Sequence, residues 1–391
     1  MKLLINTESL LPPVTGIGTY TQNLLEQFVA MQALESIECF SGRQFASATQ
    51  TLHERHARAQ SGDVSPPPSH GGLHRLLRNS SLAYRAREAL RNNLLRLQSA
   101  RLKNSVYHEP NFILRAHKGP CVATIHDLSF IHYPQHHPAK RVTWLKEELP
   151  KTLKRADFLI TDSECVRQDL IANHNVPGAK VRTIYLGASD DFRPLDEERT
   201  RETLSHYNLT HGEYILFVGT LEPRKGIDIL LSAWRSLSKE SLNGKKLILA
   251  GAAGWNNEDL LQLIKELEQK NNLRHLQFVP NSHLPALYAG AYLFVYPSVY
   301  EGFGLPVLEA MRSGTPALCA TGTAMAEFSN GSTHYFENGS SEDLAEQLEF
   351  LLQDEAYRQA LAQRGLQTSQ AYSWRRCAEE TMKIYKLISR S

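Results

Sequence analysis

Short apolar runs that alternate with helical patterns constrain the fold of this chain more than any other feature. Residues 2–6 (KLLIN), 121–126 (CVATIH) and 156–163 (ADFLITDS) are continuous apolar runs that end in polar residues, as buried strands of parallel sheets do. Helical patterns follow such runs, and the same alternation restarts at residues 214–220 (YILFVGT). The repeat predicts an α/β protein with two doubly wound parallel sheets, each covered by helices on both faces.

The length of the chain and one polar segment indicate where the two domains divide. A chain of 391 residues is too long for one compact core, and a polar stretch covers residues 188–212. We therefore expect domains at residues 1–190 and 191–370, followed by a last helical segment at 371–391. In doubly wound sheets ligands bind at the carboxyl ends of the strands, so two facing Rossmann-like domains would enclose a central cleft.

Composition excludes several classes of protein. The chain is 42% hydrophobic and 21% charged with a net charge of +2, which is typical of a soluble globular protein and gives no overall attraction to nucleic acid. Its five cysteines are scattered, which favours reduced thiols over a disulfide scaffold. Residues 1–13 make a poor signal peptide, and no run reaches the length needed to span a bilayer. We expect a cytoplasmic protein, at most peripheral on the inner face of the cell membrane.

Residues 42–105 interrupt the alternation with a basic insert. The run 65–72 (SPPPSHGG) predicts a loop, and after it Ala86, Leu90, Leu94 and Leu97 recur at helical spacing among many arginines. A basic amphipathic helix can lie on an anionic membrane surface or bind an acidic partner. An ordinary solvated helix packed on the first domain is the alternative. Nucleic-acid binding is disfavoured because no recognition motif accompanies the charge.

Two candidate positions in the first half lie at predicted strand ends. Gly16 and Gly18 separate the first strand from its helix, and glycines there would allow a ligand to approach the backbone closely. A plain tight turn is the alternative, since the pair is not a full dinucleotide-binding fingerprint. His126 follows an apolar strand, so it could donate a hydrogen bond to the substrate or act as a general base; a structural histidine is the alternative.

In the second half, Arg224 and Lys225 lie in the loop between a buried strand and the helix that follows it. Two cations next to the N–H groups of a helix N-terminus suit a pyrophosphate, because the guanidinium binds bidentately and the ammonium neutralises charge. A surface pair on a loop is the alternative.

Residues 298–316 (SVYEGFGLPVLEAMRSGTP) contain two glutamates around a glycine-rich turn. Gly302 and Gly304 would let backbone amides face a phosphate at the helix N-terminus. Glu301 and Glu309 would repel that phosphate, so we expect them to accept hydrogen bonds from sugar and ribose hydroxyls instead. Glu301 as a helix cap, with Glu309 favourable to the helix dipole, is the alternative.

Together, the segments YEGFGLPVLEAM, VGTLEPRKG, GIGTYTQNLL, HDLSF and YSWRRCAEETMKIY resemble the retaining glycosyltransferases of family 4, and within them bacterial mannosyltransferase-like members that build surface polysaccharides. The resemblance covers most of the chain except about residues 42–105 and implies the two-domain GT-B fold. It implies that residues 1–190 bind the acceptor, that residues 191–370 bind the nucleotide sugar, and that the last helix, within 371–391, crosses back to the first domain. It implies that Glu301 contacts the donor sugar and Glu309 the ribose, with Arg224 and Lys225 on the diphosphate. The other donor contacts that it implies are His126, Gly16, Gly18, Thr220, Val279 (near the base), and the backbone amides of Phe303, Gly304 and Leu305.

The function implied by this resemblance is transfer of a hexose from a sugar nucleotide, with GDP-mannose favoured, to a glycan or polyprenyl-linked acceptor. It implies no cofactor and no metal, because Arg224 and Lys225 would neutralise the leaving group. Thr19 departs from the family, which often carries arginine after the two glycines. A sugar-nucleotide 2-epimerase of the same fold and a non-catalytic glycan- or nucleic-acid-binding protein are the alternatives. The sequence does not identify the nucleotide base, the sugar, the acceptor or the oligomeric state.

Overall fold

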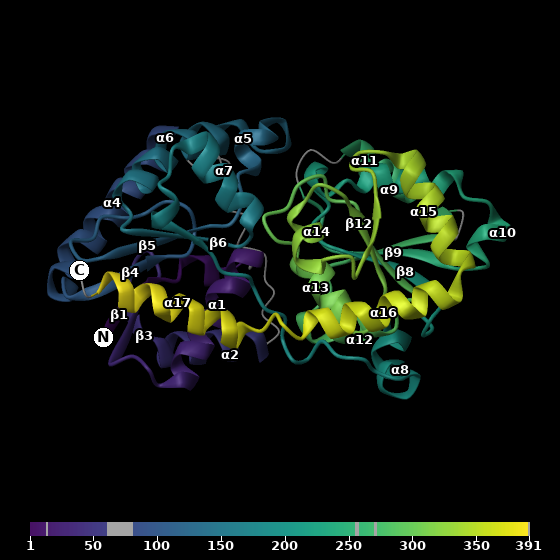
Figure 1. Ribbon diagram of the computed structural model, residues 1–391, viewed down its shortest axis with the longest axis horizontal. Coiled ribbons are helices and arrows are strands. Elements are labelled where there is room, and N and C mark those ends of the chain that lie inside the picture. The colour runs from purple at the N-terminus through teal and green to yellow at the C-terminus, as the bar shows by residue number, and fades with distance from the viewer. Residues whose placement is uncertain (13–14, 61–80, 255–257, 270–271, 390–391) are drawn as a thin grey trace. The chain divides into compact units, whose positions relative to one another are not determined.

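The computed structural model describes residues 1–12, 15–60, 81–254, 258–269 and 272–389. It contains two compact units: Met1–Leu186 with Trp374–Ser391, and Gly187–Ser373 (Figure 1). The division falls at 186 rather than at the expected 190, because the backbone after Leu186 pairs with the second unit, where the amide of Ala188 donates to the carbonyl of Tyr372. The final segment likewise starts at Trp374 rather than at 371. The expected cleft between the sheets stays a prediction.

The first unit contains a seven-stranded sheet in the order β3-β2-β1-β4-β5-β6-β7. Its strands pair in parallel except β3, which runs antiparallel to β2 at one edge, where an all-parallel sheet was expected. The strands are β1 (Lys2–Asn6), β2 (Ser36–Phe40), β3 (Phe45–Ser47), β4 (Ser105–Glu109), β5 (Cys121–Ile125), β6 (Phe158–Thr161) and β7 (Val181–Thr183). The helices are α1 (Gly16–Met31), α2 (Ala48–Gln60), α4 (Ser81–Ser99), α5 (Ser129–His132), α6 (Ala139–Arg155), α7 (Glu164–His174) and α17 (Trp374–Ile388).

Helix α17 is the last element of the chain and belongs to the first unit, where it runs beside α1 (yellow against purple in Figure 1). One face of α17 is buried, and the ring of Tyr385 lies 5.7 Å from that of Phe28 on α1. The hydroxyl of Tyr385 is 2.6 Å from Nδ1 of the buried His108 on β4. The last helix therefore joins the first core through aromatic contacts and one buried hydrogen bond.

The second unit contains a six-stranded parallel sheet in the order β10-β9-β8-β11-β12-β13. Its strands are β8 (Tyr214–Val218), β9 (Lys246–Ala250), β10 (Leu273–Gln277), β11 (Leu293–Tyr296), β12 (Ala317–Ala320) and β13 (His334–Phe336). Its helices are α8 (Glu197–His206), α9 (Ile227–Ser236), α10 (Lys239–Leu242), α11 (Glu258–Gln269), α12 (Leu284–Ala289), α13 (Leu305–Arg312), α14 (Ala324–Ser329), α15 (Ser341–Gln353) and α16 (Glu355–Ser369).

Both sheets reverse their strand order at one place. The chain proceeds from β1 to one side and places β4 on the other side, and in the second unit it does the same around β8 and β11. Loops that leave such a pair of strands diverge to opposite sides, so a crevice forms at their carboxyl ends, and ligands of doubly wound sheets bind there. Ligands are therefore expected to bind at the carboxyl ends of the strand pairs β1/β4 and β8/β11.

The described part of the basic insert consists of β3, α2 and α4, and the loop expected at 65–72 lies outside the described residues. Among the side chains of α4 that the structure describes, Leu95 is buried and Leu94 is half-buried, whereas Leu90 and Leu97 are 61% and 73% exposed. Of the four positions expected to form the apolar face, Leu90 and Leu97 therefore do not pack on the first unit, and the side chain of Ala86 lies outside the described part. Among the described helices, none combines the length and the apolarity needed to cross a bilayer.

Candidate functional site

At the β8/β11 switch point, two loops bring three of the predicted residues into direct contact. Lys225 Nζ lies 2.5 Å from Glu301 Oε1, and Arg224 Nη1 lies 3.1 Å from Glu301 Oε2. Both cations come from the short helical turn after β8, and Glu301 comes from the loop after β11. The side chains of all three are only 11–12% exposed, so Arg224 and Lys225 are not a surface pair.

Neighbouring polar groups complete this cluster. Lys225 donates to the hydroxyl of Tyr296 at 2.6 Å, Ser298 donates to Glu301 at 2.6 Å, and Arg224 forms a second ion pair with Glu222 at 3.0 Å. We call Glu222, Arg224, Lys225 and Glu301 the EPRK–Glu cluster. With two carboxylates and two cations its formal charge is zero, as a cluster removed from water requires.

Electrostatics within the cluster fix its protonation. Burial alone would raise the pKa of Glu301, but Arg224 and Lys225 lower it to about 2, so the carboxylate is ionised at neutral pH. Burial lowers the pKa of Lys225 below its ordinary value, against the opposing effect of Glu301. The sequence interpretation directed Glu301 away from the phosphate and toward hydroxyl groups, which stays a prediction. The structure adds a contact with both cations, because buried cations need a counter-charge.

The helices beside the cluster begin at glycines rather than at side-chain caps. Gly226 precedes α9 and Gly304 precedes α13, with φ angles of 64° and 107°. A Cβ at Gly226 would lie 2.2 Å from the carbonyl oxygen of Pro297, and one at Gly304 would lie 2.5 Å from Cγ of Met325. Only glycine fits either position. In the first turn of α13, Pro306 has no N–H and the amide of Val307 donates to the carbonyl of Gly304, so the amide of Leu305 is the one in this turn that suits an anion.

The other predicted donor residues of the second unit vary in burial. Glu309 lies on α13, accepts a hydrogen bond from Tyr288 at 2.9 Å, and has a pKa raised by burial to about 7, against the lowering by that bond. Phe303 stacks on Phe328, so its ring belongs to the core and only its backbone could serve a ligand. Thr220 is exposed directly after β8, Val279 is buried after β10, and Leu305 is the first residue of α13.

In the first unit, His126 is buried with both ring nitrogens engaged. Its Nδ1 lies 2.7 Å from Oδ2 of Asp162, and its Nε2 lies 2.7 Å from the carbonyl oxygen of Pro110. Two acceptors favour the doubly protonated ring, so the pKa of His126 is raised by Asp162 in spite of the lowering that burial causes. This geometry suits a fixed hydrogen-bond donor and disfavours the general-base role, which needs an unprotonated nitrogen.

Gly16 and Gly18 differ in their surroundings. Gly16 is the exposed first residue of α1, and a Cβ there would meet nothing within 4 Å. Gly18 is buried inside the same helix. The surrounding protein therefore leaves room for a side chain at position 16.

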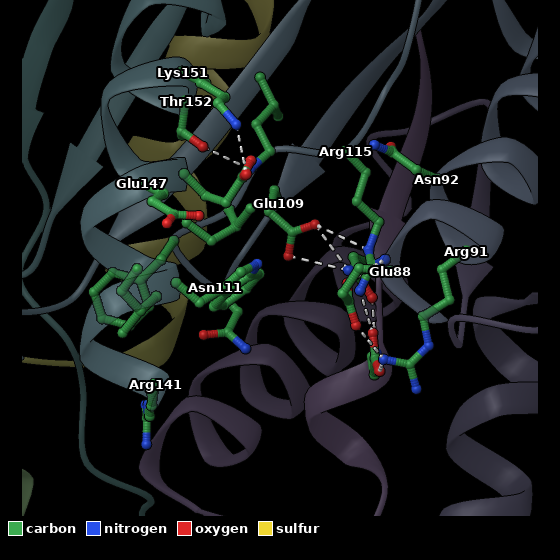
Figure 2. Close-up of a pocket in the computed structure, with 18 of the residues that line it drawn as sticks. Glu88, Arg91, Asn92, Glu109, Asn111, Arg115, Arg141, Glu147, Lys151 and Thr152 are labelled. Atoms are coloured by element: carbon green, nitrogen blue, oxygen red, sulfur yellow. Dashed lines mark hydrogen bonds and ion pairs between the residues drawn. The ribbon is translucent and has the colours of Figure 1, made fainter. Parts of the chain in front are cut away.

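Sequence reasoning missed a second polar cluster, at the β1/β4 switch point, which we call the Glu109 cluster. Its members are Asn6, Glu8, Glu88, Arg91, Tyr107, Glu109 and Arg115. Glu109 ends β4 and accepts hydrogen bonds from Asn6 at 2.8 Å and from Tyr107 at 2.7 Å. Arg115 lies 3.9 Å from Glu109 and also pairs with Glu8 at 2.5 Å and Glu88 at 3.1 Å. Arg91 contacts Glu8 and Glu88 (Figure 2). The signal in the sequence that could have indicated this cluster is Glu109, an acidic residue at the end of β4, the strand that pairs with β1.

Comparisons with known proteins agree with this architecture. Residues 14–192 match the family described as Glycosyltransferase Family 4, and residues 202–368 match Glycosyl transferases group 1. The chain is 32% identical over 388 residues to the O-antigen chain mannosyltransferase B of Escherichia coli, a match that covers 99% of this chain and 100% of that one. Two solved structures align over 99% of both chains: Anabaena Alr3699/HepE in complex with UDP and glucose (TM-score 0.71, 18% identity) and WaaG, a glycosyltransferase involved in lipopolysaccharide biosynthesis (TM-score 0.70, 16% identity).

A chain with two Rossmann-like domains and these matches has the GT-B fold, and it belongs to glycosyltransferase family 4. It is a glycosyltransferase similar to mannosyltransferases. The full-length relationship favours group transfer over the epimerase and over the non-catalytic binding protein considered from the sequence.

Proposed function

We propose that the protein transfers mannose from GDP-mannose to a hydroxyl of a glycan or lipid-linked acceptor, with retention of the anomeric configuration, in the synthesis of a bacterial surface polysaccharide. The observation that carries this proposal is the buried EPRK–Glu cluster beside the uncapped N-terminus of α13. The full-length likeness to an O-antigen chain mannosyltransferase supports mannose as the sugar and a polysaccharide as the product.

In the proposed reaction, the bond between the anomeric carbon and the diphosphate breaks, and its electron pair goes to the diphosphate. Arg224, Lys225 and the backbone amide of Leu305 at the start of α13 stabilise the charge that develops on that leaving group. The acceptor oxygen attacks from the face that the diphosphate leaves, and its proton passes to a diphosphate oxygen. This route needs no nucleophilic carboxylate, and Glu301 is unsuited to that role because both its oxygens face cations.

The same two cations support a reaction without a metal ion. Charge on a departing diphosphate is commonly neutralised by a divalent cation, and Arg224 with Lys225 can supply that charge instead. We expect the rate of mannose transfer to remain unchanged after treatment with EDTA, measured by release of GDP. A rate that falls on chelation and returns with added Mg²⁺ or Mn²⁺ would contradict this part of the proposal.

A donor panel tests the central proposal. Purified protein is incubated with GDP-mannose, GDP-fucose, UDP-glucose or UDP-N-acetylglucosamine and a mannose-terminated acceptor, and the product linkage is read by NMR. We expect transfer only from GDP-mannose, with an α-linked product. UDP-glucose belongs in the panel because the structure of HepE holds UDP-glucose. Donor incubated alone separates transfer from epimerisation, since an epimerase would form a new sugar nucleotide without any acceptor.

We also propose that α4 contacts an anionic membrane surface, where a lipid-linked acceptor would reside. Leu90 and Leu97 are seven residues apart and so lie on one face of the helix, and both are exposed beside Arg96. Replacing both leucines with serine should reduce sedimentation with phosphatidylglycerol vesicles about tenfold or more, because two exposed apolar side chains leave the interface. Leu387→Ser on α17, also exposed, is the matched control. Equal sedimentation of all three proteins would refute the membrane proposal.

A further inference from the structure

Three aromatic residues of the second unit pack together next to the turn that precedes α13. They are Phe303 from that turn, Phe328 from α14 and Tyr372 from the segment between α16 and α17. The rings of Phe303 and Phe328 stack with centres 4.6 Å apart, and the ring of Tyr372 meets them edge-on at 6.4 and 5.8 Å. Aromatic pairs in these arrangements are attractive beyond the burial of their surface. The contacts therefore hold together three segments that are distant in the sequence.

The hydroxyl of Tyr372 fixes this aromatic cluster to the end of α14. It donates a hydrogen bond to the carbonyl oxygen of Phe328 at 3.0 Å. Helix α14 ends at Ser329, so this carbonyl is one of the last four of the helix, which have no intrahelical donor. Tyr372 therefore caps the C-terminus of α14 from another segment and packs its ring against the same helix.

Helix α14 in turn limits the backbone of the turn before α13. A Cβ at Gly304 would lie 2.5 Å from Cγ of Met325 and 3.7 Å from the ring of Phe328, so this backbone packs closely against α14. Leu305, whose amide suits an anion, follows Gly304 directly. The position of that amide therefore depends on where α14 lies, and Tyr372 helps to hold α14 in place.

The backbone of Tyr372 belongs to the segment by which the chain leaves the second unit, between α16 and α17 (Figure 1). Its carbonyl accepts a hydrogen bond from the amide of Ala188, where the chain has just entered that unit. Trp374 begins α17 and is buried in the first unit, where its ring lies 6.3 Å from that of Tyr20 on α1. Only Ser373 separates the two aromatic side chains. The segment is thus held by a large ring in each unit.

Tyr292 makes similar contacts in the same unit but away from the turn before α13. It is also half-buried, and its hydroxyl donates to the carbonyl oxygen of Leu352 in the last turn of α15 at 3.3 Å. Its ring packs under the cations of Lys245 and Arg358 at 4.0 and 3.8 Å. Tyr292 directly precedes β11, whereas the turn before α13 follows the other end of that strand. The residue is therefore a matched control for Tyr372.

We propose that Tyr372 is a positioning residue of the donor site, which holds residues 302–305 in the conformation that presents the amide of Leu305 to the diphosphate of the sugar nucleotide. It acts through Phe303 and Phe328 and does not itself touch the ligand. The inference rests on the proposed function for the ligand. It goes beyond that function by assigning the preorganisation of the donor turn to a residue that is 67 positions away from Leu305 in the sequence.

Steady-state kinetics of mannose transfer and calorimetry with GDP test the proposal. Tyr372→Ala should raise the KM for GDP-mannose and the Kd for GDP about tenfold, because the competent turn is populated less often, and the acceptor KM should stay the same. Tyr372→Phe keeps the ring and loses one neutral hydrogen bond, so both values should stay within about threefold of the wild type. A protein that is merely destabilised would contain fewer active molecules, which lowers the apparent kcat and leaves the donor KM unchanged.

Amide hydrogen exchange measures the turn without any ligand. The amide of Val307 donates to the carbonyl of Gly304 at 3.0 Å, and this bond breaks when the turn opens. Exchange in a peptide that covers residues 299–308 should therefore be about tenfold faster in Tyr372→Ala than in the wild type. Tyr372→Phe should exchange close to the wild-type rate.

The control variants are Tyr292→Ala and Tyr292→Phe, which should leave the donor KM and the exchange of residues 299–308 unchanged, whatever they do to the melting temperature. Wild-type values of both quantities in Tyr372→Ala would overturn the proposal, and so would equal changes in Tyr292→Ala. If Tyr372→Ala does not fold, Tyr372→Leu replaces it, because leucine keeps apolar volume without the ring or the hydroxyl. Tyr292→Leu is then the control.

The positioning role and the proposed reaction fail in distinguishable ways. If the wild-type protein neither binds GDP nor transfers mannose, the proposed reaction is wrong, and exchange of residues 299–308 still decides whether Tyr372 holds the turn. If mannose is transferred with the same donor KM by the wild type and by Tyr372→Ala, and the exchange rates agree, the reaction stands and the positioning role is wrong.

Discussion

The polar clusters at the two switch points differ in how strongly they hold the charge of a buried glutamate. In the second unit, Glu301 is held by two cations within 3.1 Å and keeps its charge, with a pKa of about 2. In the first unit, burial raises the pKa of Glu109 to about 7, although Arg115 and the hydrogen bonds from Asn6 and Tyr107 act in the opposite direction. The same residue type at the same topological position is therefore ionised in one unit and close to half-protonated at neutral pH in the other.

Two factors explain this difference in pKa: the distance from the cation to the carboxylate, and the number of carboxylates that share the cation. Lys225 makes its closest ion pair with Glu301, whereas Arg115 lies 3.9 Å from Glu109 and is closer to Glu8 and Glu88. Coulomb energy falls with distance, and a cation shared among three carboxylates stabilises each of them less. The EPRK–Glu cluster thus has equal numbers of carboxylates and cations, whereas Glu8, Glu88 and Glu109 are three carboxylates for the two guanidinium groups of Arg91 and Arg115.

The strongest test of this contrast removes Lys225, the cation that lies closest to Glu301 in the EPRK–Glu cluster. Lys225→Ala should lower the turnover of mannose transfer about 100-fold or more, because one preorganised donor to the developing diphosphate charge is lost. Initial rates at saturating donor and acceptor measure the effect. Arg235→Ala, an exposed arginine on the helix that follows, is the matched control and should retain its rate. Transfer by Lys225→Ala within a factor of about three of the wild-type rate would be incompatible with the proposed role.

A second test compares glycines in the two units. Gly304→Ala should lower the free energy of unfolding by about 2 kcal/mol or more, since a Cβ at this φ would collide with Met325. Gly16→Ala should change it by less than about 0.5 kcal/mol, because nothing lies near that position and alanine suits a helix. Urea unfolding measures both. Equal losses in the two variants would show that the steric demand at α13 has been misjudged.

Much of this architecture could be predicted because local patterns encode it. Apolar runs with helical patterns between them indicate parallel sheets wherever they occur. Arg224, Lys225 and Glu301 could be assigned to the carboxyl ends of strands, since each lies in a loop that follows a strand. The antiparallel strand β3 could not be foreseen, because a three-residue edge strand has no distinctive periodicity.

Contacts between segments that are distant in the sequence were harder to predict. His126 could be placed at a strand end from its neighbours in sequence, but its partners Asp162 and Pro110 come from two other segments, and they turn it from a candidate base into a fixed donor. The Glu109 cluster includes residues from β1, β4 and α4, which are far apart in the sequence, so no local motif predicts it. The pairing of Glu301 with the cations was missed for a related reason, because it depends on two loops that only the sheet order brings together.

The smallest expected effect concerns pH and the Glu109 cluster. Glu109 binds a proton more tightly in the folded protein, with a pKa of about 7, than at its ordinary value of 4.5. The folded state therefore holds more protons between pH 4.5 and pH 7, and this group lowers stability as the pH rises through that window. Glu109→Gln should remove about 1 kcal/mol of the loss in unfolding free energy between pH 5 and pH 6.

Urea unfolding at pH 5, 5.5 and 6 measures this slope for the wild type and for two variants. Glu54→Gln, which removes an exposed carboxylate from α2 in the same unit, is the control and should follow the wild-type slope. Glu301→Gln should not flatten the slope in this range, because a carboxylate with a pKa of about 2 is ionised throughout it. If Glu109→Gln and Glu54→Gln change the slope alike, then Glu109 is ionised like any surface carboxylate, and the contrast between the two switch points disappears.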